Sequence, residues 1–127
     1  MNLSSSPATT ILISADTGRA RSFYEQTLGL PYRGTTEDGG PIFDLAGSAA
    51  LALMEDPEMV PSGRTTLTFE VDDIEDAIQE LGSRGIEFED YDLPGLKTVD
   101  HVADLGDTKS AWFLDPDGNV LCLHEVL

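Results

Sequence analysis

The C-terminal segment of the chain holds two residues that could do chemistry together, Cys122 and His124. Cys122 is the only cysteine, and a thiol near an imidazole can act as a nucleophile with its base. Residues two apart on a strand lie roughly 6.5 to 7 Å apart at the backbone, however, and nothing in the sequence fixes the ring against the sulfur. A small buried hydrophobic residue is the alternative role for Cys122.

Four further residues could bind or transform a small molecule or cover its site. Glu70 could be a general base if it lay beside a ligand, or it could lie in water, because an unpaired buried carboxylate is costly. Trp112, the only tryptophan, could stack on an aromatic ligand or simply fill space. His101 and Lys97, in the long segment 92–107, could cover one end of a cleft or could balance nearby acidic charge. His124 could equally be a hydrogen-bonded residue at a strand end.

Two segments with the same pattern must position these residues. Each starts with a β-type run, at 9–14 and 66–71, followed by Asp16 or Asp73, which could cap a helix. Apolar residues then recur at helical spacing and a glycine comes next, as is typical of a helix and its end. The apolar stripes are Ala20, Phe23, Tyr24 and Thr27 or Leu28 in the first segment, and Ile74, Ala77, Ile78 and Leu81 in the second.

The stretches after the two predicted helices also resemble each other. Apolar runs flank a glycine-bearing turn in both segments, which predicts a hairpin, and a further strand is expected around Tyr32 and over 88–91. The chain is therefore expected to be one α+β domain over 1–127, built from two βαβββ modules at about 8–57 and 64–127. The inner faces of the two sheets are expected to enclose a cleft.

The charge of the chain restricts its partners. The chain has 24 acidic and 7 basic residues, a formal net charge of −17. Nucleic acid is not expected as a partner, because its binding depends on Lys and Arg neutralising phosphates. The acidity suggests either adaptation to a salty cytoplasm or an ordinary acidic protein. The absence of a long apolar run argues against a membrane span, and one cysteine with no recognisable signal peptide favours the cytoplasm.

Three motifs resemble one family. "SFYEQTLGL", "FEVDDIEDA" and "FLDPDGNVLCLHE", in this order, are similar to the vicinal oxygen chelate superfamily, which includes glyoxalase, bleomycin-resistance proteins and extradiol dioxygenases. The resemblance extends from about Thr9 to Glu125. It implies the two-module fold just described and a homodimer, whereas the activity varies widely within this scaffold.

The resemblance also implies where a metal would be bound. Family enzymes use His or Glu at four positions, which by motif spacing fall on Thr9, Ala52, Thr66 and Cys122. Two hydroxyls, a methyl group and a thiol are a poor donor set for a divalent cation. Cys122 with His124, even with His101 added, would supply three ligands at most. We therefore expect no metal and no cofactor.

Strand alternation predicts what lines the cleft instead. Residues that share a face with the four former ligand positions form a mixed surface suited to a small, partly aromatic compound. The expected ligand-binding residues are Thr9, Ile11, Ala52, Met54, Thr66, Thr68, Glu70, Trp112, Cys122, His124 and His101. The alternate residues are expected in the core, namely Leu12, Leu51, Leu53, Leu67, Phe69, Val71, Phe113, Leu121 and Leu123.

These features favour a metal-free protein that captures a small hydrophobic or aromatic compound, as bleomycin-resistance proteins do. The alternative is a lyase, isomerase or dioxygenase-type enzyme of the same superfamily with a non-standard site. Its weak catalytic candidates would be Glu70, His124 and Cys122. A third possibility is a partner-binding or regulatory domain whose cleft is filled by its own side chains.

Overall fold

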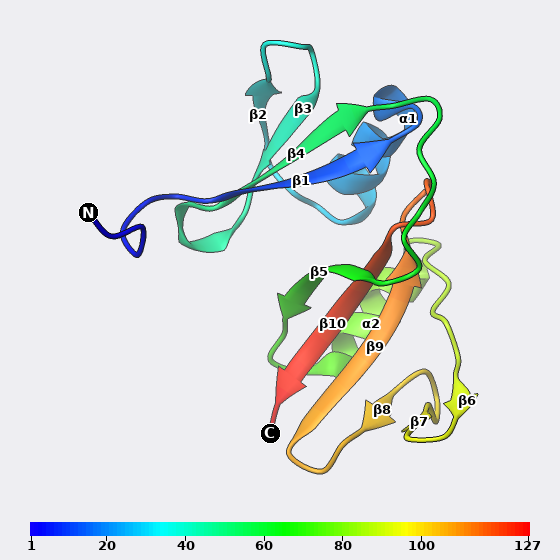
Figure 1. Ribbon diagram of the computed structural model, residues 1–127. Helices are drawn as coiled ribbons and strands as arrows, with labels where there is room; N and C mark the ends of the chain where they lie inside the picture. The colour runs from blue at the N-terminus through cyan, green and yellow to red at the C-terminus, as the bar shows by residue number, and fades with distance from the viewer. The chain divides into compact units, whose positions relative to one another are not determined.

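The computed structural model describes residues 1–127, which divide into two compact units, unit 1 (1–60) and unit 2 (61–127). Each unit contains a four-stranded sheet with a helix packed against it (Figure 1). The α+β class with two such sheets is confirmed. The single domain and its cleft stay predictions. No helix is both long and apolar enough to cross a membrane.

Unit 1 is built around sheet A, whose strand order is β1-β4-β3-β2. Strand β1 runs parallel to β4, and the other neighbours are antiparallel. The elements of unit 1 are β1 (Thr9–Ser14), α1 (Thr17–Ser22), the π-helix η1 (Phe23–Thr27), β2 (Tyr32–Thr35), β3 (Pro41–Asp44), the 3-10 turn η2 (Ala46–Ser48) and β4 (Ala50–Glu55).

The first predicted helix is present, but it changes type partway along. Ala20 in α1 and Tyr24 in η1 are fully buried, as their apolar stripe predicts. The π-helical turn has a different side-chain spacing from an α-helix, and Phe23 is only half-buried. Gly40 is required for packing in this unit, because a Cβ atom there would lie 2.0 Å from the backbone oxygen of Leu53.

Unit 2 is built around sheet B, whose strand order is β5-β10-β9-β8. Strand β10 runs parallel to β5 and antiparallel to β9. Helix α2 lies behind these strands (Figure 1). The elements of unit 2 are β5 (Thr65–Glu70), α2 (Ile74–Ser83), β6 (Asp92–Leu93), β7 (Leu96–Lys97), β8 (Ala103–Asp104), β9 (Thr108–Leu114) and β10 (Val120–Val126).

The strand predicted over 88–91 is not formed, and this prediction was wrong. Phe88 makes only an isolated bridge to β9. The backbone of Tyr91 is instead occupied by Thr98, whose Oγ1 accepts from the Tyr91 N–H and whose N–H donates to the Tyr91 carbonyl, each at 2.8 Å. The fourth strand of sheet B is β8, which lies within the long segment 92–107.

The predicted core is largely confirmed. Six of its members are buried, and the three from β5 and the residue after it are half-buried. The buried members are Leu12, Leu51, Leu53, Phe113, Leu121 and Leu123, and the half-buried members are Leu67, Phe69 and Val71.

The starts of α1 and α2 are capped in the same way. Asp16 and Asp73 each accept a hydrogen bond from the backbone N–H three residues later, at 3.2 and 3.1 Å, so both caps are confirmed. A second carboxylate reaches each helix start from the last strand of its sheet. Glu55 accepts from Thr17 N at 3.1 Å, and Glu125 accepts from Ile74 N at 2.7 Å.

Candidate functional site

Sheet B turns one face toward α2 and leaves the other face open. We call the surface formed by Thr66, Thr68, Glu70, Ser110, Trp112, Cys122 and His124 the open face of sheet B. These residues share one side because side chains alternate along a strand. The register places Thr68 and Trp112 on either side of Cys122, and Glu70 and Ser110 on either side of His124. Seven residues, from three strands, thus form one continuous surface.

Cys122 lies at the centre of this face with 5% of its surface exposed. Its Sγ donates to the carbonyl of Leu123 at 3.3 Å. Burial raises the pKa of the Cys122 thiol, and this outweighs the hydrogen bonds from Ser110, Ala111 and Thr68 that act to lower it. A thiol held in its neutral form is a poor nucleophile, so the geometry favours the packing role of Cys122 over the catalytic one.

His124 is held by Glu70 rather than by Cys122. The Nδ1 atom of His124 lies 2.5 Å from Oε1 of Glu70, directly across the parallel strand pair. The side chain of His124 is 27% exposed and that of Glu70 is 65% exposed. Glu70 is therefore exposed to water, which is one of the two alternatives that the sequence left open. Its pairing with His124 was not predicted from the sequence.

Trp112 provides the aromatic part of the face and is half-buried. The ring of Tyr91 meets it edge-to-face, with the centroids 5.5 Å apart and the planes at 86°. Partial burial raises the pKa of the Tyr91 hydroxyl, with Glu89 and Cys122 adding to the effect. Tyr91 is the functional candidate missing from the predicted ligand-binding set, because the turn that brings it to Trp112 depends on its pairing with Thr98.

His101 lies elsewhere in unit 2. Its Nδ1 is 3.0 Å from Asp90, and its ring is 6.0 Å from that of Phe88. With Phe88 it lines a hollow of about 530 Å³ whose other residues, Ile78, Gln79, Gly82, Ile86 and Glu87, belong to α2 and the turn after it. The structure does not bring His101 together with His124 or Trp112 in any contact.

The corresponding face of sheet A, formed by Thr9, Ile11, Ile13, Ala50, Ala52 and Met54, is different. Ile11 lies opposite Ala52, and Ile13 lies opposite Met54. Ile11 and Met54 are 48% and 45% exposed, whereas Ala52 is 2% exposed. Asp44 lies opposite Ala50 in the neighbouring strand and therefore shares this face, where it pairs with Arg33 at 2.7 Å. Apart from this exposed ion pair and the hydroxyl of Thr9, the face offers apolar contact.

The four positions at which the family would bind a metal do not suit one. The hydroxyl of Thr66 donates to the carbonyl of Val120 at 3.1 Å, next to a register shift in β10. Cys122 is held as a neutral thiol, and Ala52 has no donor atom. Divalent cations need imidazole, carboxylate or thiolate ligands, so this donor set does not fit a catalytic metal.

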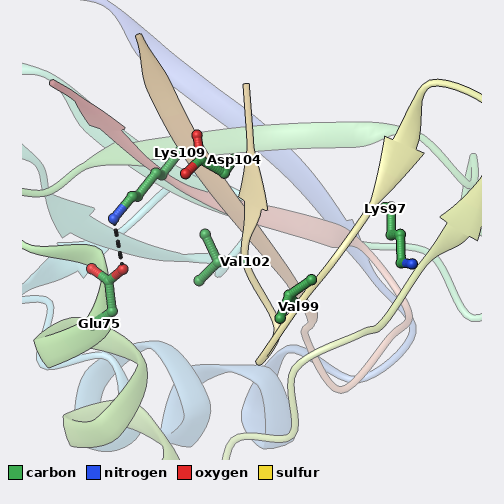
Figure 2. Close-up of a pocket in the computed structure, with 6 residues that line it drawn as sticks. All are labelled: Glu75, Lys97, Val99, Val102, Asp104 and Lys109. Carbon is green, nitrogen blue, oxygen red and sulfur yellow. Dashed lines mark hydrogen bonds and ion pairs between the residues drawn. The ribbon is translucent and has the colours of Figure 1, made fainter. Parts of the chain in front are cut away.

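A second hollow in unit 2, of about 290 Å³, contains both lysines of the chain (Figure 2). Lys109 spans it to Glu75 at 2.8 Å, and this contact lowers the pKa of Glu75 and raises that of Lys109. Lys97 lies apart from that pair, at the other side of the hollow (Figure 2). The lining carries two lysines and two carboxylates, those of Glu75 and Asp104, so its charges balance. The hollow therefore selects neither anions nor cations.

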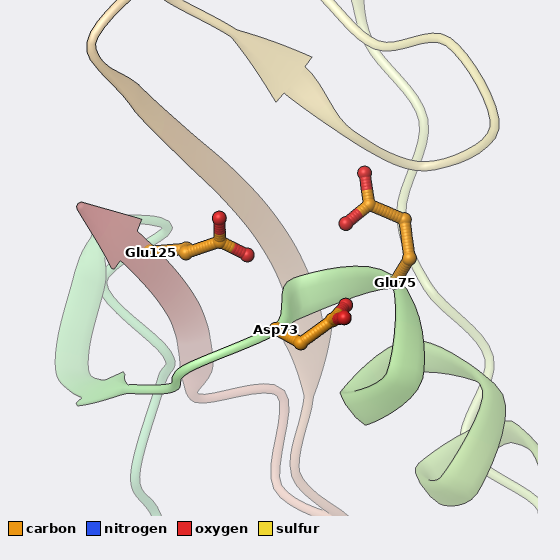
Figure 3. Close-up of side chains that lie close together, drawn as sticks. All are labelled: Asp73, Glu75 and Glu125. Carbon is orange, nitrogen blue, oxygen red and sulfur yellow. The ribbon is translucent and has the colours of Figure 1, made fainter. Parts of the chain in front are cut away.

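Asp73, Glu75 and Glu125 bring three carboxylates within 4.8 Å of one another (Figure 3). Each already has a structural partner. Asp73 and Glu125 cap the start of α2, and Glu75 pairs with Lys109. The same capping by Glu55 in unit 1 indicates that this cluster belongs to the duplicated fold and that a cation is not needed to explain it.

Comparisons with known proteins agree with this architecture. The family model described as Glyoxalase/Bleomycin resistance protein/Dioxygenase superfamily matches residues 7–123. A comparison with curated proteins gave no significant match.

Three solved structures illustrate the range of similar folds. An antibiotic binding protein from Streptomyces sp. CB03234 is 22% identical, with a TM-score of 0.67 over 94% of this chain and 95% of that one. A lactoylglutathione lyase from Agrobacterium tumefaciens is 20% identical, with a TM-score of 0.65 over 93% and 91%. A fosfomycin resistance protein from Listeria monocytogenes is 15% identical, with a TM-score of 0.69 over 94% and 91%. At these identities the likeness extends to the fold alone.

Proposed function

The chain belongs to the glyoxalase/bleomycin resistance protein/dioxygenase superfamily, and on this premise we propose that it captures a small, partly aromatic compound without a metal. The single observation that carries the proposal is the open face of sheet B. There a half-buried indole, a buried neutral thiol and a paired imidazole stand where the family pattern would support a metal site. Apolar surface with a few oriented polar groups is typical of a small-molecule site.

The indole supplies the contact area for the ligand. Tyr91 meets Trp112 edge-to-face and limits the orientations that its ring can adopt, which leaves a fixed aromatic surface for an incoming ring. Ser110, Thr68 and His124 surround it with polar atoms that could orient a ligand. The net charge of −17 repels anions, so we do not expect an anionic ligand.

A thermal-shift screen of small aromatic compounds tests the proposal. A compound that binds only the folded protein stabilises it by about 2.7 kcal/mol when present at 100 times its Kd, so a true ligand gives a saturable rise in Tm. Because Trp112 is the only tryptophan, its fluorescence should change along the same titration. Saturable binding that leaves Trp112 fluorescence unchanged would place the ligand elsewhere and would contradict the proposal.

Metal independence has its own test. The protein is dialysed against zinc, nickel and manganese, and the retained metal is then quantified by elemental analysis. We expect less than about one tenth of an equivalent per chain, because the four positions offer one thiol and no imidazole or carboxylate. One equivalent of any of these ions, lost in a Cys122→Ala variant, would show that the donor set had been misjudged.

An enzyme of the same superfamily is the second candidate, and the pair of His124 and Glu70 favours it. A carboxylate that fixes an imidazole is a common arrangement for a general base. The two candidates are separated by incubating the protein with each thermal-shift hit and analysing the mixture by mass spectrometry. The binding proposal expects the compound to be recovered unchanged.

A homodimer and a cytoplasmic location remain part of the proposal. Ile11, Met54 and Leu114 are each more than 40% exposed on the open sheet faces, and apolar surface of this kind favours association. Sedimentation velocity over a range of protein concentrations should give the mass of two chains. A concentration-independent mass of one chain would exclude the dimer.

A further inference from the structure

The bond between His124 and Glu70 determines which ring nitrogen carries hydrogen. An ionised carboxylate can only accept hydrogen bonds, so the Nδ1 atom that lies 2.5 Å from Glu70 must be the donor. In a neutral imidazole with hydrogen on Nδ1, the other nitrogen, Nε2, has a free lone pair and can only accept. No protein atom forms a hydrogen bond to Nε2.

The position of His124 makes this lone pair available on the face that also carries the indole. His124 is two residue pairs along from the row of Thr68, Cys122 and Trp112, which makes it the next residue of β10 on this face, and 27% of its side chain is exposed. The hydroxyls on the face can either donate or accept, so they do not select a ligand by this property. The second oxygen of Glu70 is also an acceptor only, but Glu70 lies on β5, which β10 separates from the strand of Trp112. Nε2 of a neutral His124 is therefore the acceptor-only side-chain atom on the strand next to that of Trp112.

We infer that the ligand is a neutral aromatic compound bearing a hydroxyl group, such as a phenol, whose O–H donates to Nε2 of His124 while its ring lies against Trp112. The inference rests on the proposed function, because it specifies the ligand of the same face. Glu70 is a positioning residue, since it acts by fixing the tautomer and the orientation of the imidazole. A neutral phenol also avoids the repulsion that the acidic surface exerts on a carboxylate or a phosphate.

The tautomer can be measured directly. Two-dimensional ¹⁵N–¹H spectra of the histidine side chains at pH 8 distinguish a protonated nitrogen from one with a lone pair. We expect His124 to carry hydrogen on Nδ1 only, and a His101→Gln variant identifies the signals of the other imidazole. Hydrogen on Nε2 of His124, in either the neutral or the charged ring, would overturn the inference.

Ligand selectivity is measured with 4-methylphenol, which stays neutral at pH 8 because an ordinary phenol has a pKa of about 10, and its methyl ether, 4-methoxytoluene, whose oxygen cannot donate. Titrations at pH 8, followed by NMR shifts of the Trp112 side chain, should give about threefold to tenfold tighter binding of the phenol, the range expected for one hydrogen bond. His124→Phe should remove this preference while the ether still binds, and Glu70→Gln should reduce it.

The matched control for Glu70→Gln is Glu80→Gln, which also converts a carboxylate of an exposed ion pair to an amide, in α2. It should leave the phenol preference unchanged. Equal binding of phenol and ether to the wild-type protein would overturn the inference and leave the proposed function standing. If neither probe changes the NMR shifts of the Trp112 side chain, both the proposed function and the inference are contradicted. If His124→Phe keeps the preference for the phenol, only the inference is overturned.

Discussion

Unit 1 and unit 2 share a sequence pattern and a strand order, yet they use their sheets differently. In both units the start of the α-helix, α1 or α2, is capped by an aspartate and by a glutamate from the last strand of the unit. The open face of sheet A, however, is mostly apolar, and its titratable group is Asp44, which pairs with Arg33, whereas the open face of sheet B carries Glu70, His124 and Cys122. Duplication has conserved the devices that build the fold, and the surface chemistry has diverged.

The same divergence appears in the charges. Unit 1 has eight acidic and three basic residues, and unit 2 has sixteen acidic and four basic residues. Most of the self-repulsion of the chain therefore arises in the unit that carries the candidate site. Such a surface disfavours an anionic ligand, which is consistent with the proposed neutral phenol.

The largest expected effects test whether the cores of the two units are equivalent. Phe43 in β3 and Phe113 in β9 are both fully buried, and each contacts neighbouring aromatic rings. Phe43→Ala and Phe113→Ala should each lower the free energy of unfolding by about 3–5 kcal/mol, because each leaves a cavity. Urea unfolding measures the change, with Leu93→Ala at an exposed position as the control. A loss below about 1 kcal/mol in either variant would show that its unit is loosely packed.

The next prediction compares the two open faces in ligand binding. Trp112→Ala should weaken binding of a thermal-shift hit by about 2 kcal/mol, roughly thirtyfold, since buried aromatic anchors dominate binding energy. Ile11→Ala on sheet A should weaken it less, because an aliphatic side chain offers less contact area. Isothermal titration calorimetry provides the comparison. A larger loss from Ile11→Ala would move the site from sheet B to sheet A.

The glutamate caps should differ in strength. Glu125→Ala should cost about 1–2 kcal/mol, since the bond to Ile74 N is 2.7 Å long and partly buried. Glu55→Ala should cost less than about 1 kcal/mol, since its bond to Thr17 N is 3.1 Å long and exposed. Chemical denaturation measures both, with Glu37→Ala, in an exposed turn, as the reference. Equal losses would mean that burial does not distinguish the two caps.

The smallest effect concerns the ionisation of Cys122. Its folded pKa lies above the ordinary value of 9.0, so its contribution to stability is fully present below the unfolded pKa and is lost as pH rises through the folded value. Stability should therefore fall above about pH 9 more in the wild-type protein than in Cys122→Ala. Iodoacetamide should react faster with the urea-unfolded chain than with the folded one. Equal alkylation rates would show that the thiol is accessible.

The sequence determined the parts of the fold that depend on local pattern. The apolar stripes, the aspartate caps and the alternation along strands follow from backbone geometry and from burial, so both helices, both sheets and most of the core could be predicted. The same alternation correctly sorted Leu121 and Leu123 into the core and Cys122 and His124 onto the other face.

Only the tertiary structure decided the partners of those residues. The pairing of His124 with Glu70 depends on the register of two strands separated by more than fifty residues, which no local pattern encodes. The strand predicted over 88–91 failed because Tyr91 bonds to Thr98, a competition between backbone partners that local β propensity does not include. The sequence alone was enough to identify Cys122, His124 and Glu70 as candidate reactive residues. Long-range strand pairing determined which of them are in contact.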